Sequence, residues 1–324
     1  MQQVFYDFTA FGIMVGKKPL LVCDGAFDML GINLPCEYTR FSGFGPNPRY
    51  EDILSGVKAL EENGCGFIVA IGGGSSIDTA KAIKHYSKAG VPIMAVPTTS
   101  GTGSEATKFA ALYKDGEKYS IENSSLLPDY VVLQPDTLKT LPVYQKKCTM
   151  LDALCQAIES WWSKRANAES IEFSRQSIRL ITGYMHSYLA NEYEGNKNMQ
   201  IAANLAGKAI NITTTTAPHA MSYKLTSLYG LPHGHAVALC LPKVWAYMGG
   251  FDDIANELCM KPASQAVLYF VKLLEELEIF PPKEASLSDI ELLAGSVNEQ
   301  RLNNNPAVLD SGAIRELYMQ ILEV

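Results

Sequence analysis

Four residues between positions 152 and 233 have the types and the spacing of a metal site. Asp152 and Gln156 are four residues apart, so they share one face wherever this segment is helical. His219 and His233 follow further along the chain. One carboxylate, two imidazoles and an amide oxygen form a donor set for a divalent metal. The alternative is that both histidines are structural, as isolated histidines usually are.

Two polar loops in the first half of the chain suit a phosphate-containing ligand. Gly72-Gly73-Gly74-Ser75-Ser76 follows an apolar run and precedes a helical pattern. Glycines let a phosphate approach the backbone, and a helix start offers free N–H groups. The hydroxyl-rich segment Pro97–Glu105 follows the next apolar run. Because ligands gather at the carboxyl ends of parallel strands, the two loops predict one dinucleotide site. A tight turn and a solvated loop are the alternatives.

Two further features are weaker signals when taken alone. Asp24 ends the first predicted strand, where an acid can bind ribose hydroxyls or simply form a turn. Lys208 and Asn211 are three apart in a helical pattern, and four threonines follow at 213–216. A cation with hydroxyl donors can hold an anionic substrate head, although a lone lysine on a helix is usually solvated.

The elements that must position these residues change in character along the chain. Short apolar runs at 19–23, 66–71, 91–96 and 130–133 predict buried strands, with helical patterns at 50–63 and 77–86 between them. This alternation predicts a parallel sheet covered by helices. From Leu141-Pro142 onward the patterns are helical, at 149–163, 168–189, 198–211, 264–278, 288–293 and 311–322. We therefore expect an α/β domain over 1–140 and an all-helical domain over 141–324.

Composition narrows the class of protein. The 324 residues are 47% hydrophobic and carry a formal net charge of −7, which is typical of a globular chain and argues against a nucleic-acid partner. No apolar run approaches the ~18 residues of a membrane span, and the first residues do not resemble a signal peptide. The seven cysteines include no CxxC pair, so we expect reduced thiols and a cytoplasmic protein without a membrane partner.

Several motifs in order resemble the iron-containing (group III) alcohol dehydrogenase family. They are Gly45-Pro46-Asn47-Pro48, the segments 72–81 and 97–105, Asp152-Ala153-Leu154, Pro232-His233-Gly234 and Asn304-Asn305-Pro306. The resemblance implies a dehydroquinate synthase-like architecture, with a dinucleotide-binding α/β domain and a helical metal- and substrate-binding domain. Segments 151–160 and 207–223 are more narrowly similar to the phosphonoacetaldehyde reductase branch of this family.

The resemblance also implies a cofactor, NAD(H) or NADP(H), and the residues that touch it. Asp24 is expected at the adenosine ribose and Lys118 near the nicotinamide ribose. The remaining positions, on the pyrophosphate and along the loops, are Asn47, Gly73, Gly74, Ser75, Thr98, Thr99 and Thr102. The carboxylate of Asp24 favours NAD, because it repels a 2′-phosphate.

The family's metal positions fall on Asp152, Gln156, His219 and His233, with Fe²⁺ or Zn²⁺ as the expected ion. This chain departs from the family at two places. Gln156 stands where a histidine is usual, which should weaken Fe²⁺ or Zn²⁺ binding and favour harder ions. Tyr223 stands where many members carry another histidine, and it either donates a hydrogen bond or packs. A metal-free site with His219 or His233 as proton donor is the alternative.

The implied reaction is the NAD(P)H-dependent reduction of an aldehyde to a primary alcohol, with phosphonoacetaldehyde and 2-hydroxyethylphosphonate as the expected pair. His219, His233 and Tyr223 are the expected catalytic residues, and the anionic tail is expected at Lys208, Asn211 and Thr215. Three alternatives are a general aldehyde or alcohol dehydrogenase of the same family, a non-redox sugar-phosphate cyclase-like enzyme, and a degenerate nucleotide-binding relative. Because family members commonly associate, we expect a homodimer or a larger homo-oligomer.

Overall fold

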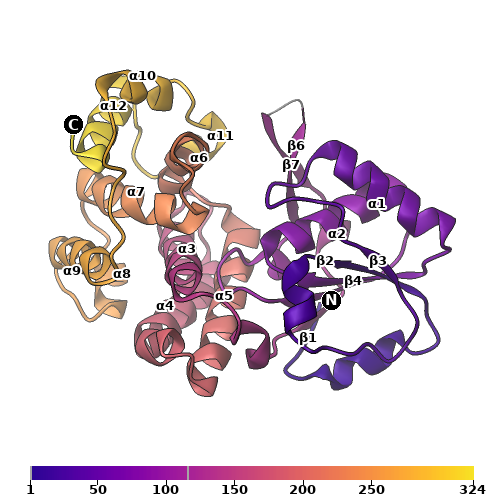
Figure 1. Cartoon of the computed structure of the whole chain (residues 1–324). Helices are drawn as coiled ribbons and strands as arrows, with labels where there is room; N and C mark the ends of the chain where they lie inside the picture. Colours follow the sequence, from indigo (N-terminus) through magenta and orange to yellow (C-terminus); the bar gives the residue numbers. More distant parts are fainter. Residues whose placement is uncertain (1, 115–116) are drawn as a thin grey trace.

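The molecule has an α/β domain and a helical domain that lie side by side (Figure 1). The computed structural model describes residues 2–114 and 117–324, without the side chains of residues 117 and 118. The predicted fold class, a parallel-sheet domain followed by a helical domain, is confirmed. Among the described residues, no helix is both long and apolar enough to cross a membrane.

A six-stranded parallel sheet forms the centre of the α/β domain, in the order β1-β8-β5-β4-β2-β3. The three central strands are wholly buried apolar runs, as expected where helices cover both faces of a sheet. The strands are β1 (Gln3–Phe5), β2 (Pro19–Cys23), β3 (Thr39–Phe41), β4 (Phe67–Gly72), β5 (Ile93–Pro97) and β8 (Tyr130–Val132). The edge strands β1 and β3 were not predicted, because each is short and includes polar side chains, whereas the equally short β8 lies in an apolar run.

Helices α1 (Tyr50–Glu62) and α2 (Gly74–Ser87) pack on one another and share an apolar cluster with one face of the sheet. The α2 helix begins three residues before the predicted start at 77, because its first turn, Gly74-Ser75-Ser76, contains no apolar residue to reveal the pattern. Outside the sheet, β6 (Phe109–Lys114) and β7 (Glu117–Glu122) form an antiparallel hairpin that the sequence analysis missed.

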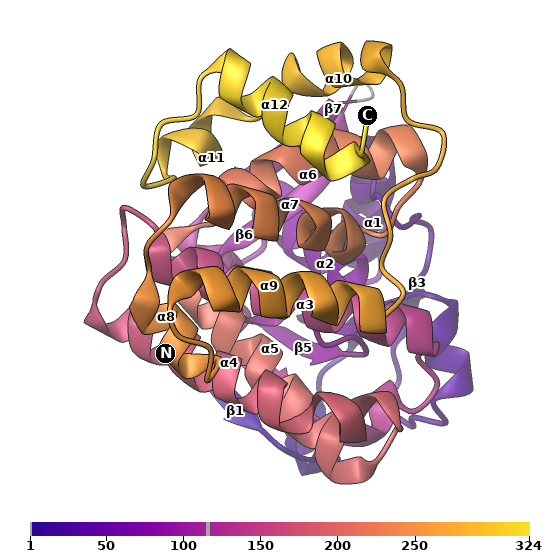
Figure 2. The ribbon, with the colours of Figure 1, turned by 90° about the vertical axis from the view of Figure 1, so that its left-hand side faces the viewer.

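The helical domain surrounds one large apolar cluster. Seen from its own side, it lies in front of the sheet (Figure 2). Its helices are α3 (Val143–Trp162), α4 (Ala168–Leu189), α5 (Tyr193–Thr213), α6 (Ala217–Tyr229), α7 (His233–Met248), α8 (Asp252–Glu257), α9 (Ala263–Glu276), α10 (Leu287–Ala294), α11 (Glu299–Asn303) and α12 (Ser311–Leu322). The α7 helix was not predicted, because it is apolar on nearly every side and therefore has no polar stripe.

The two domains meet where α5 packs against the loop that follows β5. Gly103 in this loop has φ +60°, and a Cβ there would lie 2.5 Å from the Cα of Gly207 on α5. On either side of this contact, Asn204 Nδ2 donates to Glu105 Oε1 (3.1 Å), and the Lys108 N–H donates to Asn211 Oδ1 (2.9 Å). The two glycines thus let the backbone of the loop approach the backbone of α5, and the two hydrogen bonds fix the position of α5 against the loop.

We expect Gly103→Ala to destabilise the protein by about 2 kcal/mol, because the new methyl group adds left-handed strain to a collision with α5. The matched control is Gly183→Ala on the exposed side of α4, where a Cβ meets nothing within 4 Å. That change should stabilise the helix by about 0.5–1 kcal/mol. Denaturant unfolding followed by circular dichroism measures both, and an unchanged midpoint for Gly103→Ala would contradict the packing argument.

Candidate metal and nucleotide site

Three potential metal ligands converge from three helices of the helical domain. Asp152 lies on α3, His219 on α6, and His233 is the first residue of α7. Their ligand atoms all lie within 4.8 Å of one another. His219 Nε2 is 3.3 Å from Asp152 Oδ1, and both side chains are buried. Residues far apart in sequence therefore form one compact group of two imidazoles and a carboxylate.

Gln156 lies one helical turn after Asp152 on α3 and is 3% exposed. A hydrogen bond from its side chain helps to lower the pKa of Asp152, while its Oε1 accepts no hydrogen bond from any described residue. A buried amide oxygen without a donor is costly unless a cation meets it. The orphaned oxygen and the three converging ligands fit a divalent metal with two oxygen and two nitrogen donors.

Glu159, which was not predicted from the sequence, contacts the cluster of potential metal ligands through His219. It is fully buried one turn beyond Gln156, and its Oε2 is hydrogen-bonded to Nδ1 of His219. Its Oε1 accepts from the backbone N–H and the hydroxyl of Thr216, both at 2.9 Å. A carboxylate on one imidazole nitrogen directs the other nitrogen toward a metal. The spacing of 152, 156 and 159 on one helix face was the signal that could have revealed it.

Electrostatics in this cluster follow from burial and from the paired charges. Burial alone would lower the pKa of His219, but the charges of Glu159 and Asp152 and hydrogen bonds to both raise it to about 10. Burial opposes ionisation of Asp152, yet His219 and His233 hold the pKa of its carboxyl below the usual value. The carboxyl group of Asp152 and the ring of His219 therefore stabilise each other's charged forms.

Tyr223 lies one turn after His219 on α6 and stacks on His233. The two ring centroids are 5.8 Å apart and the planes meet at 19°. His233 in turn meets His219 nearly edge-on, with centroids 5.3 Å apart at 71°. Tyr223 therefore helps to fix the plane of the His233 ring.

The two polar loops of the α/β domain touch one another. A Cβ at Gly74 would lie 2.8 Å from Thr102 side-chain atoms, and one at Gly73 would lie 3.3 Å from Thr99. Gly73 caps α2 without any side-chain hydrogen bond, so the N–H groups of the first turn remain available to an anion. Thr98 is buried, and its N–H donates to the Gly72 carbonyl at 3.0 Å.

Asp24 lies beside this loop at the end of β2. Its carboxylate accepts from the Ala26 N–H (2.9 Å) and the Ser76 hydroxyl (3.3 Å). A Cβ at Gly72 would lie 3.3 Å from Asp24 Oδ2 and much closer still to Ser76 Oγ, so glycine is required for this approach. The acid is thus fixed next to the phosphate-type loop, although part of its hydrogen-bonding capacity caps the turn that follows.

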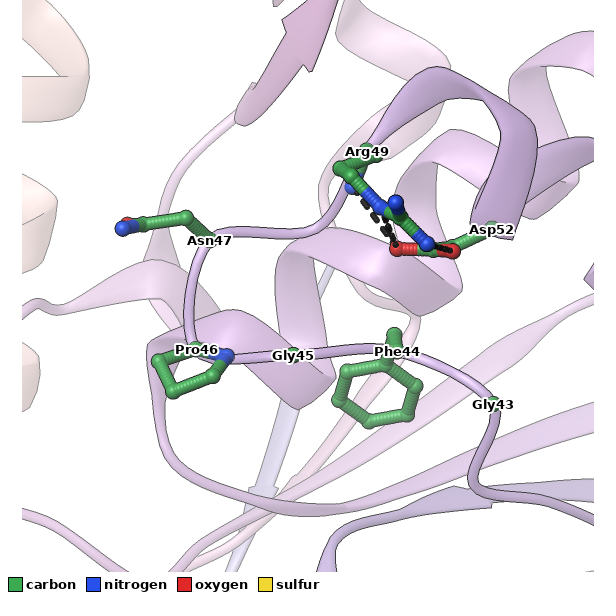
Figure 3. Close-up of a pocket in the computed structure, with 7 residues that line it drawn as sticks. All are labelled: Gly43, Phe44, Gly45, Pro46, Asn47, Arg49 and Asp52. Carbon is green, nitrogen blue, oxygen red and sulfur yellow. Dashed lines mark hydrogen bonds and ion pairs between the residues drawn. The ribbon is translucent and has the colours of Figure 1, made fainter.

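The loop between β3 and α1 carries Asn47 and lines a pocket of about 400 Å³. Figure 3 shows the Asn47 side chain pointing away from the Arg49–Asp52 ion pair. The Ser75 hydroxyl donates to the Pro46 carbonyl, so Ser75 attaches this loop to the glycine loop. The pocket thus lies beside the glycine loop rather than at the three potential metal ligands. Its lining is Gly43, Phe44, Gly45, Pro46, Asn47, Arg49 and Asp52.

A second buried network, also missed from sequence, joins α2 to the hydroxyl loop. Lys81 Nζ is fully buried and donates to the Phe109 carbonyl (2.8 Å), Thr107 Oγ1 (3.2 Å) and Ser104 Oγ (3.3 Å). Burial lowers the pKa of Lys81 to about 8, against the opposing charges of Asp78 and Glu105. This lysine therefore fixes the position of the hydroxyl loop relative to the glycine loop.

The structure gives each residue predicted to bind an anion a different environment. Lys208 Nζ lies 5.9 Å from the Phe173 ring on α4, whereas Asn211 contacts the Lys108 backbone and Thr215 is buried. Burial lowers the pKa of Lys208, against the charge of Glu105. Lys118 pairs with Tyr113 in the hairpin, and its side chain lies outside the described residues.

Comparison with protein families identifies the family to which the chain belongs. A family model described as iron-containing alcohol dehydrogenase matches residues 8–135. A second model, described as Fe-containing alcohol dehydrogenase family, C-terminal, matches residues 147–322. The chain belongs to the iron-containing alcohol dehydrogenase family. Its membership makes it an oxidoreductase, and the predicted resemblance is confirmed.

Individual relatives of this iron-containing alcohol dehydrogenase have different names. It is 28% identical to 1-propanol dehydrogenase PduQ of Salmonella typhimurium, over 94% of this chain and 93% of that protein. It is 30% identical to a phosphonoacetaldehyde reductase of Streptomyces viridochromogenes, over 77% of this chain and 74% of that protein. The solved structure of sulfoacetaldehyde reductase from Bifidobacterium kashiwanohense in complex with NAD⁺ has a TM-score of 0.91 at 24% identity, over 100% and 97% of the two chains, and supports the fold.

We expect Glu159→Gln to weaken metal binding about 10- to 100-fold. The amide would turn an N–H toward His219 Nδ1, which forces the ring proton onto Nε2, the atom that faces Asp152. Isothermal titration of chelator-treated protein with Mn²⁺ or Zn²⁺ measures the change. Glu169→Gln on the exposed start of α4 is the control. Equal affinities for both variants would show that Glu159 does not orient His219.

Proposed function

We propose that this protein is an NADH-dependent reductase of small anionic aldehydes, which converts phosphonoacetaldehyde to 2-hydroxyethylphosphonate. The observation that carries the proposal is the convergence of Asp152, His219 and His233, with the orphaned oxygen of Gln156 beside them. The similarity to a phosphonoacetaldehyde reductase over 77% of the chain supports the substrate. We place nucleotide binding in residues 1–140, and metal and substrate binding in 141–324.

In this proposal, Asp152, Gln156, His219 and His233 hold a divalent metal, which supplies a Lewis acid for the aldehyde oxygen. NADH supplies the hydride. The protein's own residues fix geometry: Glu159 orients His219, and Tyr223 orients His233. They also exclude water, since Asp152, Gln156 and His219 are buried. Holding the reacting groups in one orientation is the main way in which a protein assists a cofactor.

We infer that the nicotinamide cofactor binds along the two touching loops. The uncapped N-terminus of α2, at Gly73 and Gly74, suits the pyrophosphate. Asp24 beside Gly72 suits the adenosine ribose hydroxyls, and its charge favours NAD over NADP. The remaining contacts proposed along this path are Asn47, Ser75, Thr98, Thr99, Thr102 and Lys118. We also propose a cytoplasmic location, consistent with seven unpaired cysteines, and a homo-oligomeric state.

A second candidate function is a general alcohol dehydrogenase of the same family. The similarity to 1-propanol dehydrogenase PduQ extends over 94% of the chain and favours this candidate. The substrates of the two candidate functions differ in charge. The two candidates are therefore distinguished by whether the protein prefers an aldehyde with an anionic tail. In the first proposal Lys208, Asn211 and Thr215 contribute to binding that tail.

The deciding experiment compares phosphonoacetaldehyde with a neutral aldehyde of equal length. Oxidation of NADH and NADPH is followed by absorbance, with chelator-stripped protein to which Fe²⁺, Zn²⁺, Mn²⁺, Mg²⁺ or no metal is restored. The proposal predicts metal-dependent turnover with NADH that favours the phosphonate. Turnover of the neutral aldehyde alone would support the general dehydrogenase. NADH binding without any turnover would support a degenerate relative.

We expect Lys208→Ala to raise KM about tenfold for phosphonoacetaldehyde and to leave KM for the neutral aldehyde nearly unchanged, because a charge-assisted contact is lost only with the anion. The control is Lys197→Ala, which removes another lysine of the same helix, one that pairs with Glu194. Steady-state kinetics at saturating NADH give both constants. Equal losses on the two aldehydes would exclude Lys208 as an anion anchor.

We expect Gln156→His to strengthen Zn²⁺ binding relative to Mn²⁺, because an imidazole replaces a harder amide oxygen at a buried position beside Asp152. Gln156→Leu, of similar size but without a donor, should weaken both metals. Competition titrations, with the Mn²⁺ electron paramagnetic resonance signal as readout, measure the ratio without any enzyme assay. An unchanged ratio in Gln156→His would mean that this side chain does not contact the metal.

A further inference from the structure

Arg301 on the short helix α11 reaches from the helical domain to the hairpin of the α/β domain. Its guanidinium carbon lies 5.9 Å from the centre of the Phe109 ring, and Phe109 is the first residue of β6. Figure 1 shows α11 on the side of the helical domain that faces this hairpin. The contact therefore crosses the boundary between the domains, and neither residue was singled out in the sequence.

Arg301 is half-buried and has no carboxylate partner and no side-chain hydrogen bond among the residues that the structure describes. The neighbouring cations differ in this respect. Lys108 Nζ pairs with Glu122 at 3.0 Å, and Lys208 is within reach of the charge of Glu105. An aromatic ring attracts a guanidinium but accepts none of its N–H groups in their plane. The planar donors of Arg301 therefore remain available to an oxyanion.

The residues on both sides of the Arg301–Phe109 contact connect to groups that the proposed function uses. On the helical side, Asn304 follows α11, and its amide donates to the carbonyls of Thr213 (2.8 Å) and Thr215 (3.1 Å). The next residue along that loop, Thr216, binds the Glu159 carboxylate that supports His219. Arg301 is thus attached through a few residues to the metal-ligand cluster.

On the hairpin side, Lys108 precedes Phe109, and its N–H donates to Asn211 Oδ1 at 2.9 Å. That bond fixes the orientation of the Asn211 amide, because the oxygen must face the donor. The Asn211 Nδ2 makes no hydrogen bond to any described residue and is not among the buried unpaired atoms. A second donor is therefore free in the immediate neighbourhood of Phe109.

We propose that Arg301 is a specificity-determining residue that binds the oxyanion at the tail of the aldehyde substrate, assisted by the amide of Asn211. This inference rests on the proposed function and adds a residue to it. A planar guanidinium with free donors matches two oxygens of a phosphonate, sulfonate or carboxylate at once. Because Arg301 is not neutralised by any described acid, it supplies net positive charge where Lys108 does not.

The test is Arg301→Gln, assayed with phosphonoacetaldehyde, sulfoacetaldehyde and a neutral aldehyde of equal length at saturating NADH. We expect KM to rise about 10- to 100-fold for the two charged aldehydes, with KM for the neutral aldehyde within about twofold of wild type. Arg301→Lys should fall between wild type and Arg301→Gln, since it keeps the charge but loses the fork. A larger effect with the phosphonate than with the sulfonate identifies the doubly charged tail as the preferred ligand.

Two control variants separate anion binding from a structural contact between the domains. Phe109→Leu removes the ring but keeps the cation, and it should retain the preference for charged aldehydes. Arg315→Gln removes an exposed arginine that pairs with Glu291 on α10, and it should leave all constants unchanged. If Arg301→Gln and Phe109→Leu reduce kcat/KM equally for charged and neutral aldehydes, Arg301 only joins the domains and the inference is overturned.

A binding measurement distinguishes failure of the inference from failure of the proposed function. Titration of the NADH-loaded protein with methylphosphonate reports anion binding without turnover. If wild type shows no preference for charged aldehydes, the proposed substrate class fails. Methylphosphonate binding that Arg301→Gln weakens at least tenfold would still support an anion site at Arg301. Equal binding by wild type and variant would overturn it.

Discussion

The packing of α5 against the loop after β5 is the constraint on which the arrangement of the site depends. The glycine loop and the cluster of potential metal ligands lie in different domains. They can act on one substrate only if the two domains keep a fixed position relative to each other. Gly103 and Gly207 allow the approach, and the buried side chain of Glu105 lies beside it, hydrogen-bonded to Asn204 of α5. Burial raises the pKa of Glu105, and hydrogen bonding by Asn204 with the charges of Lys81 and Lys208 offsets part of that effect. One acid thereby links α2, the hydroxyl loop and α5.

A single face of α3 organises the other half of the site. Asp152 and Gln156 present oxygens to the cluster, and Glu159 holds the imidazole that arrives from α6. Because all three residues are on one rigid helix, their mutual geometry is fixed before the histidines are added. Two buried carboxyl groups lie against the imidazoles, and His219 and His233 outweigh the effect of burial on the pKa of Asp152, which is held below its usual value.

The two positions at which we expect this chain to differ from its family, Gln156 and Tyr223, lie beside the same potential metal ligands. In the proposed site, Gln156 adds an oxygen donor and Tyr223 stacks on His233. The polar groups nearest the domain boundary include cations with acid partners and one, Arg301, without any among the described residues. In the proposed function, the fold positions the reacting groups, and the side chains at these places adjust which metal and which substrate tail are favoured.

The sequence by itself predicted the parallel strands, the helical second half, both glycine- and hydroxyl-rich loops, and the residues Asp152, His219 and His233, because apolar runs, turn residues and motif spacing are local properties. It did not reveal α7, whose apolar surface has no period, or the hairpin that carries Phe109. Glu159, Lys81 and Arg301 were also missed. Their roles depend on which groups they meet across helices and domains: Glu159 matters because His219 lies against it, and Arg301 because no described acid does. Partners distant in sequence are decided only when the tertiary structure brings them together.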